Sequence, residues 1–149
     1  MVETTPDLHG ILSAFFADYA AAINANDEDV ILSFLATPHG IRTGEQTVFL
    51  ETTEEVRTNM DEVLTLYEAN GVEHVVPHLD EAKDLPANAA AARIDWRLED
   101  GKGNALLTFE SRYTLAAEDN VWAIVAVDAT DEVAAWDRAG WRGDLASAL

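Results

Sequence analysis

The chain has 149 residues, which suits a single domain with a substantial core, and its 28 acidic residues against 9 basic ones give a net charge of −19. Such a charge repels nucleic-acid phosphates and anionic membrane surfaces, so we expect neither partner. The absence of cysteine excludes disulfides, thiolate zinc sites and a cysteine nucleophile, and the lack of a signal segment or a long apolar run predicts a cytoplasmic protein.

The first predicted element is a long amphipathic helix. Thr5 and Pro6 resemble an N-cap followed by proline at the first helical position. Apolar residues then recur at helical spacing, and the helix should end near Asn24. The residues of this stripe are Leu8, Ile11, Leu12, Phe15, Phe16, Tyr19 and Ile23.

Two further helices are predicted before the main strands. Asp27 should cap a short second helix whose apolar face holds Val30, Ile31, Phe34 and Leu35. Thr52 and Glu55 have capping-box spacing for a third helix, which Gly71 should end. Between these helices, Ile41–Leu50 is predicted to be a strand pair bent at Gly44 and Glu45.

The second half of the chain predicts an antiparallel meander. Val72–Leu79 reads as an edge strand because it contains Pro77, and Asp80–Asn88 reads as a polar loop. Residues 89–99 and 105–115 then alternate with period two, with Trp96 facing inward and Arg97 outward. Residues 121–127 are apolar on both faces.

A short tail helix over about residues 131–142, capped by Thr130, should follow a core of about residues 5–130. Helices followed by a strand meander define an α+β fold in one domain, residues 1–149.

Tyr19–Asp29 resembles the junction of the first two helices in nuclear transport factor 2-like proteins, which include SnoaL-like cyclases and ketosteroid isomerase. Residues 96–101 and 120–124 resemble later strands of that group.

The resemblance implies a cone-shaped fold, in which a bent antiparallel sheet wraps the long first helix and leaves a pocket at its open end. It also implies a homodimer, and it supports the fold more strongly than any one activity. Tyr19 falls where similar isomerases place the tyrosine that stabilises an oxyanion. Their catalytic base aligns with Thr43 and their second acid near Ser111, so the same isomerisation is not expected.

Asp128 is the second catalytic candidate. It follows Trp122, Ile124 and Ala126 on one predicted strand face, a register that carries polar residues at the pocket mouth in relatives. A carboxylate in an apolar cone would have a raised pKa and could act as a base, whereas an Asp128 that ends the strand would face solvent or cap the tail helix. The expected ligand-binding residues are His39, Trp96, Phe109, Ser111 and Tyr113.

The histidine spacing does not favour a metal site. His74 and His78 would lie about 13 Å apart along a strand, too far for one ion. We therefore expect no metal and no other cofactor. The apolar stripe of Val121, Ala123, Val125 and Val127 suggests a dimer interface on the outer sheet face.

Two functions remain open at this stage. In one, the protein binds a small apolar or weakly polar organic molecule, with or without the metal-free proton transfer of a cyclase, isomerase or dehydratase-like enzyme. In the other, the cone is packed shut and the protein is a non-catalytic dimeric interaction module. A mostly apolar pocket with a few polar groups would favour the first function.

Overall fold

Four helices and six strands make up residues 7–141, the part of the chain that the computed structural model describes. In chain order they are α1 (Leu8–Asn24), α2 (Glu28–Ser33), β1 (Leu35–Thr43), β2 (Gln46–Leu50), α3 (Thr53–Ala69), β3 (His74–Leu85), β4 (Ala89–Glu99), β5 (Ala105–Glu118), β6 (Val121–Asp128) and α4 (Thr130–Ala139). The α+β class predicted from the sequence is confirmed. Within residues 7–141, no helix combines the length and apolar character needed to cross a membrane.

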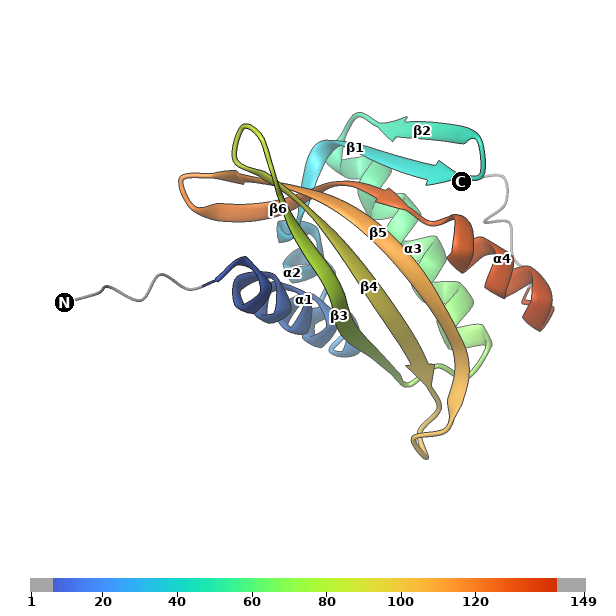
Figure 1. Ribbon diagram of the computed structural model, residues 1–149. Coiled ribbons are helices and arrows are strands. Elements are labelled where there is room, and N and C mark those ends of the chain that lie inside the picture. Colours follow the sequence, from blue (N-terminus) through green and yellow to red (C-terminus); the bar gives the residue numbers. More distant parts are fainter. Residues whose placement is uncertain (1–6, 142–149) are drawn as a thin grey trace.

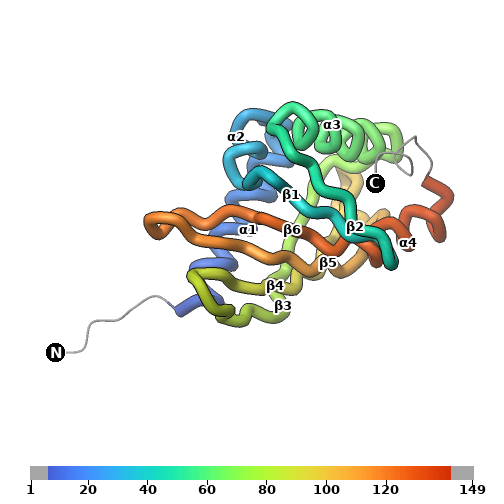
Figure 2. Tube along the Cα trace, turned by 90° about the horizontal axis from the view of Figure 1, so that it is seen from above, coloured from blue at the N-terminus to red at the C-terminus, as the bar shows by residue number. Residues whose placement is uncertain are grey.

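The six strands form one open sheet in the order β2-β1-β6-β5-β4-β3. The long strands β3, β4 and β5 bend strongly, and α1, α2 and α3 all lie on one side of the sheet (Figures 1 and 2). This is the expected cone around the first helix. The sheet is mixed rather than wholly antiparallel, because β1 pairs in parallel with β6 and joins the β1–β2 hairpin to the meander.

The helix starts follow local capping chemistry. The N-cap of α1 is Asp7, whose carboxylate accepts from Gly10 N at 2.8 Å, while the predicted cap Thr5–Pro6 lies outside the described residues. Asp27 caps α2 as predicted. Thr52 caps α3 as predicted, through a 3.2 Å bond from Glu55 N, while the Glu55 carboxylate accepts from Glu51 N and not from the N-cap residue.

Strands β4 and β5 have the predicted facing. Trp96 is buried and pairs with Phe109 across β4 and β5, whereas Arg97 is exposed. Inward residues of both strands pack with α1 to form the main core. The largest fully buried side chains there include Phe16, Ile94 and Leu115. Burial of this apolar face is the main driving force for the cone.

The edge strand β3 is longer than predicted. It carries Pro77 and lies at the end of the sheet, as expected, but it continues to Leu85 through residues that were predicted to be a loop. The register shifts between Leu79 and Glu81, so Asp80 is a bulge residue. The polar sequence was misleading because an edge strand beyond a bulge can expose most of its side chains.

A second bulge changes the facing of β6. Thr114 pairs with Ala126 and Leu115 pairs with Ile124, which leaves Val125 as an extra residue. One extra residue reverses the inward and outward positions that follow it. The prediction that Val127 lies on the outer face is therefore wrong, and so is the inward facing predicted for Asp128.

Candidate functional site

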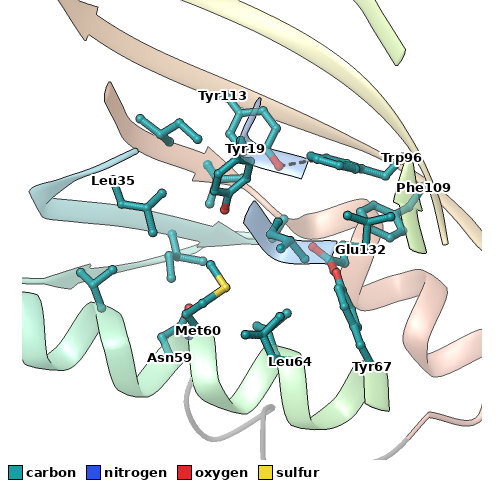
Figure 3. A pocket seen from close by; sticks show the side chains of 18 of the residues that line it. Tyr19, Leu35, Asn59, Met60, Leu64, Tyr67, Trp96, Phe109, Tyr113 and Glu132 are labelled. Carbon is teal, nitrogen blue, oxygen red and sulfur yellow. Dashed lines mark hydrogen bonds between the residues drawn. The ribbon is translucent and has the colours of Figure 1, made fainter. Parts of the chain in front are cut away.

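A cavity of about 90 Å³ lies between α3, the concave face of the sheet and the first turns of α4 (Figure 3). Most of its wall is aliphatic or aromatic. A few polar side chains interrupt this wall: Tyr19, His39, Asn59, Tyr67, Tyr113, Glu132 and Trp136. A mostly apolar cavity with a few convergent polar groups is typical of a small-molecule site.

An aromatic cluster forms the sheet side of the cavity. Trp96 Nε1 donates to Tyr113 Oη at 2.9 Å, and the Tyr19 ring lies edge-on to Trp96 with centroids 6.4 Å apart. The Tyr19 hydroxyl points into the cavity in Figure 3. Burial, and secondarily the charge of Glu132, raises the pKa of Tyr19, so its hydroxyl remains a hydrogen-bond donor at neutral pH.

Glu132 supplies the acidic group of the cavity. It lies in the first turn of α4, and its carboxylate accepts a hydrogen bond from the Tyr67 hydroxyl of α3 (Figure 3). Burial raises the pKa of Glu132 from 4.5 to about 7, and the bond from Tyr67 offsets part of this increase. Part of the Glu132 residue reaches solvent. Because its pKa is about 7, the carboxyl group can both accept and release a proton near neutral pH.

Three further polar side chains reach the cavity from different elements. His39 lies on β1, Asn59 on α3 and Trp136 on α4. His39 Nδ1, Asn59 Nδ2 and Trp136 Nε1 are buried without a hydrogen-bond partner among residues 7–141. Burial lowers the pKa of His39, so its ring is neutral at pH 7. The cavity thus offers polar atoms that a bound molecule could satisfy.

Most of the residues predicted for the site line this one cavity. They are Tyr19, His39, Trp96, Phe109 and Tyr113. Their roles in binding or catalysis stay predictions. Ser111 also faces inward and is buried, but it packs within the core and does not line the cavity.

Asp128 lies on the other face of the sheet. It borders the shallow outer grooves together with Arg112, its direct partner on β5. Its Oδ1 accepts from Thr130 N at 3.1 Å and from Thr130 Oγ1 at 2.6 Å. The predicted placement of Asp128 beside Tyr19 is wrong because the Val125 bulge reverses the strand's facing. Groups on opposite faces cannot act on one small substrate.

The cavity carboxylate was missed in the sequence. Asp131 and Glu132 open a helix, where acidic residues are commonly solvated and favoured by the helix dipole. The sequence did indicate this position, because in a helix Glu132 lies next to Val133 and one turn before Trp136, at the border of an apolar face. The predicted cap of this helix was also wrong, since Ala129 is the N-cap and Thr130 bonds elsewhere.

The outer sheet face carries a groove of about 450 Å³ opposite the cavity. A cross-strand row of charged residues borders it, in the order Glu81, Arg93, Arg112, Asp128 and Arg42. Phe49 on β2 is 60% exposed at the same groove. Among residues 7–141, His, Asp and Glu side chains form no group of three that could hold a metal ion.

Comparison with protein families places the chain in a known group. A family model described as NTF2-like protein (DUF6841) matches residues 9–132. A search of curated proteins found no match to the sequence.

Solved structures are similar in fold at low sequence identity. A domain of unknown function with a cystatin-like fold from Nostoc punctiforme PCC 73102 is 15% identical over 84% of this chain and 77% of that chain, with a TM-score of 0.63. An NTF2-like protein of unknown function from Shewanella oneidensis MR-1 is 18% identical over 78% and 93% of the two chains, with a TM-score of 0.56. Aln2 from a Streptomyces species is 14% identical over 85% and 92%, with a TM-score of 0.62. These similarities concern the fold alone.

Proposed function

The chain belongs to the NTF2-like family, and because a shared fold does not determine one activity, we propose a function from the residues that line its cavity. The protein binds a small, uncharged organic molecule inside the cone, and Glu132 transfers a proton at a carbon next to a carbonyl group. The observation that carries this proposal is the Glu132 carboxyl, held in the cavity against Tyr67 with a pKa of about 7.

The charge of the cavity favours an uncharged ligand. Among the described residues that line it, none is lysine or arginine, and His39 is neutral at pH 7. An anion would meet Glu132 and a chain with a net charge of −19. The aliphatic and aromatic wall suits the hydrocarbon part of such a ligand.

The proposed proton transfer needs a base and an oxyanion donor. The Glu132 carboxylate accepts the proton of the carbon–hydrogen bond, and the electron pair of that bond moves toward the carbonyl oxygen to form an enolate. Tyr19 is suited to donate to that oxygen, because its hydroxyl faces the cavity and its raised pKa keeps it protonated. Returning the proton to carbon completes an isomerisation or an exchange.

The proposal is tested by proton exchange into a simple ketone. Wild-type protein in deuterated buffer at neutral pH should speed deuterium incorporation next to the carbonyl of acetone, observed by NMR. Glu132→Gln should remove the acceleration because an amide cannot accept this proton. Glu110→Gln is the matched control, since Glu110 lies on the outer face where its carboxylate accepts from Arg112 at 2.9 Å. Equal exchange rates for wild type and Glu132→Gln would reject the proposal.

A second candidate function is a dimeric interaction module. It is favoured by the outer groove, where Phe49 is 60% exposed beside Gly40 and Ala126. A second copy of this chain would cover that apolar side chain and could match the mixed charges of the adjoining row. The two functions are compatible because they use opposite faces of the sheet.

A further inference from the structure

Two side chains of the cavity carry polar atoms that the described part of the chain leaves unpaired. His39 and Trp136 are each 5% exposed, and both line the same cavity. His39 Nδ1 and Trp136 Nε1 have no hydrogen-bond partner within residues 7–141. Buried polar atoms in folded proteins are nearly always paired, so each such atom in a cavity points to a partner supplied from outside the chain.

The chemistry of His39 defines what its partner must be. Burial lowers the pKa of His39, and a contact with the backbone of Ile124 offsets part of this decrease, so the ring is neutral at pH 7. In the neutral ring, a proton on one nitrogen leaves the other as an acceptor. A hydroxyl group can both donate and accept, so it can pair with His39 Nδ1 in either form of the neutral ring.

Trp136 requires a hydrogen-bond acceptor. An indole N–H can only donate, so Trp136 Nε1 needs an acceptor such as a carbonyl or hydroxyl oxygen. Asn59 adds a second unpaired donor, Nδ2, to the cavity wall. A hydroxyl group at His39 and an acceptor oxygen at Trp136 would thus satisfy unpaired atoms of the cavity.

Size limits the molecule that can satisfy them. The cavity volume is about 90 Å³, smaller than a cavity of roughly 150 Å³ that binds one benzene molecule. A ligand smaller than benzene, with about four to five non-hydrogen atoms, is therefore of the size that the cavity admits.

We infer that the ligand is a small, uncharged hydroxy-carbonyl compound on an apolar frame, with its hydroxyl group bound by His39 and its carbonyl oxygen bound by Trp136. The inference rests on the proposed function and names the ligand class of the same cavity. It also gives roles to two residues that the proton transfer on Glu132 does not use.

The test uses the full chain and NMR titration with hydroxyacetone. Three related probes serve as comparisons: acetone lacks the hydroxyl group, pentane lacks both polar groups, and acetate is an anion. We expect the hydroxy-ketone to bind most tightly and to shift the Trp136 indole N–H resonance, which is assigned by its loss in Trp136→Phe. We also expect it to shift the Nδ1 resonance of His39, because that nitrogen gains a hydrogen-bond partner.

Trp136→Phe retains the aromatic ring and removes the donor, so it should weaken binding of the hydroxy-ketone about two- to tenfold. Trp122→Phe is the matched control, since Trp122 packs against the main core and does not line the cavity. Its affinity for the same probe should equal that of wild type. Unfolding curves for both variants separate lost binding from lost structure.

Three results would overturn the inference. Pentane could bind as tightly as the hydroxy-ketone, the Trp136 and His39 resonances could stay unmoved at saturation, or no probe could bind because ordered water alone fills the cavity. These results are distinguishable from failure of the proposed function. If the ligand class is wrong, the Glu132-dependent exchange still occurs. If Glu132→Gln exchanges deuterium as fast as wild type, the order of probe affinities is unaffected.

Discussion

Asp128 accepts two hydrogen bonds from Thr130, from the backbone N–H at 3.1 Å and from the hydroxyl at 2.6 Å. Thr130 Oγ1 in turn accepts from Gly44 N at 2.8 Å, so this threonine links the β1–β2 turn to the start of α4. Asp131 Oδ2 adds a bond from Glu110 N at 2.7 Å. These contacts fix the turn of helix that places Glu132 in the cavity.

Asp128→Ala should therefore act on Glu132 from the opposite face of the sheet. Loss of both acceptor bonds should cost about 1 kcal/mol of unfolding free energy. It should also lower the pKa of Glu132 toward its ordinary value, because a loosened first turn admits water to the carboxyl group. Chemical denaturation and a carboxyl NMR titration measure the two effects.

Asp128→Asn is the control, since it retains an acceptor oxygen and should preserve the Glu132 pKa. A Glu132 pKa that is the same in Asp128→Ala as in wild type would contradict this positioning role.

The Tyr67–Glu132 bond leads to a prediction of opposite sign. The Tyr67 hydroxyl stabilises the charged carboxylate, so Tyr67→Phe should raise the pKa of Glu132 above about 7. A carboxyl NMR titration gives this value directly. Tyr19→Phe is the control, because the Tyr19 hydroxyl has no hydrogen bond to Glu132 among the described contacts. An unchanged Glu132 pKa in Tyr67→Phe would show that the bond does not form in solution.

The outer sheet face predicts self-association through Phe49. Replacing this 60% exposed side chain by Glu should shift a dimer to monomer in sedimentation, since a new charge would be buried at the interface. Val30→Glu is the control, because Val30 is 42% exposed on α2, away from that face. Added salt should strengthen the dimer by screening the net charge of −19. A monomeric wild type at micromolar concentration would rule out this interface.

The sequence predicted the fold well because the meander alternates clearly. Trp96 and Arg97 could be assigned to opposite faces since polar and apolar residues alternate from Arg93 to Glu99 in β4. In β6 both faces are apolar, so no pattern revealed the bulge at Val125, and the error carried through to Asp128. The role of Glu132 depends on how α4 docks against the cone, which is a tertiary contact that helical periodicity does not specify.

The raised pKa of Glu132 also predicts how stability depends on pH. In the unfolded chain the carboxyl group has a pKa near 4.5, and in the folded protein about 7, so between these values the folded state binds more protons. The contribution of Glu132 is thus fully present below pH 4.5 and is lost as pH rises through 7. The loss should be on the order of 3 kcal/mol in unfolding free energy.

Glu132→Gln isolates this contribution because it removes the titration and retains the size of the side chain. Relative to wild type, the variant should gain stability as pH rises from 5 to 8, as measured by urea denaturation at each pH. His39 has a lowered pKa, so its contribution is lost as pH falls, and it is present in both proteins and cancels in the comparison. A constant stability difference across this range would mean that Glu132 titrates alike in the folded and unfolded states and is exposed to water, which would remove the basis for its proposed role as a base.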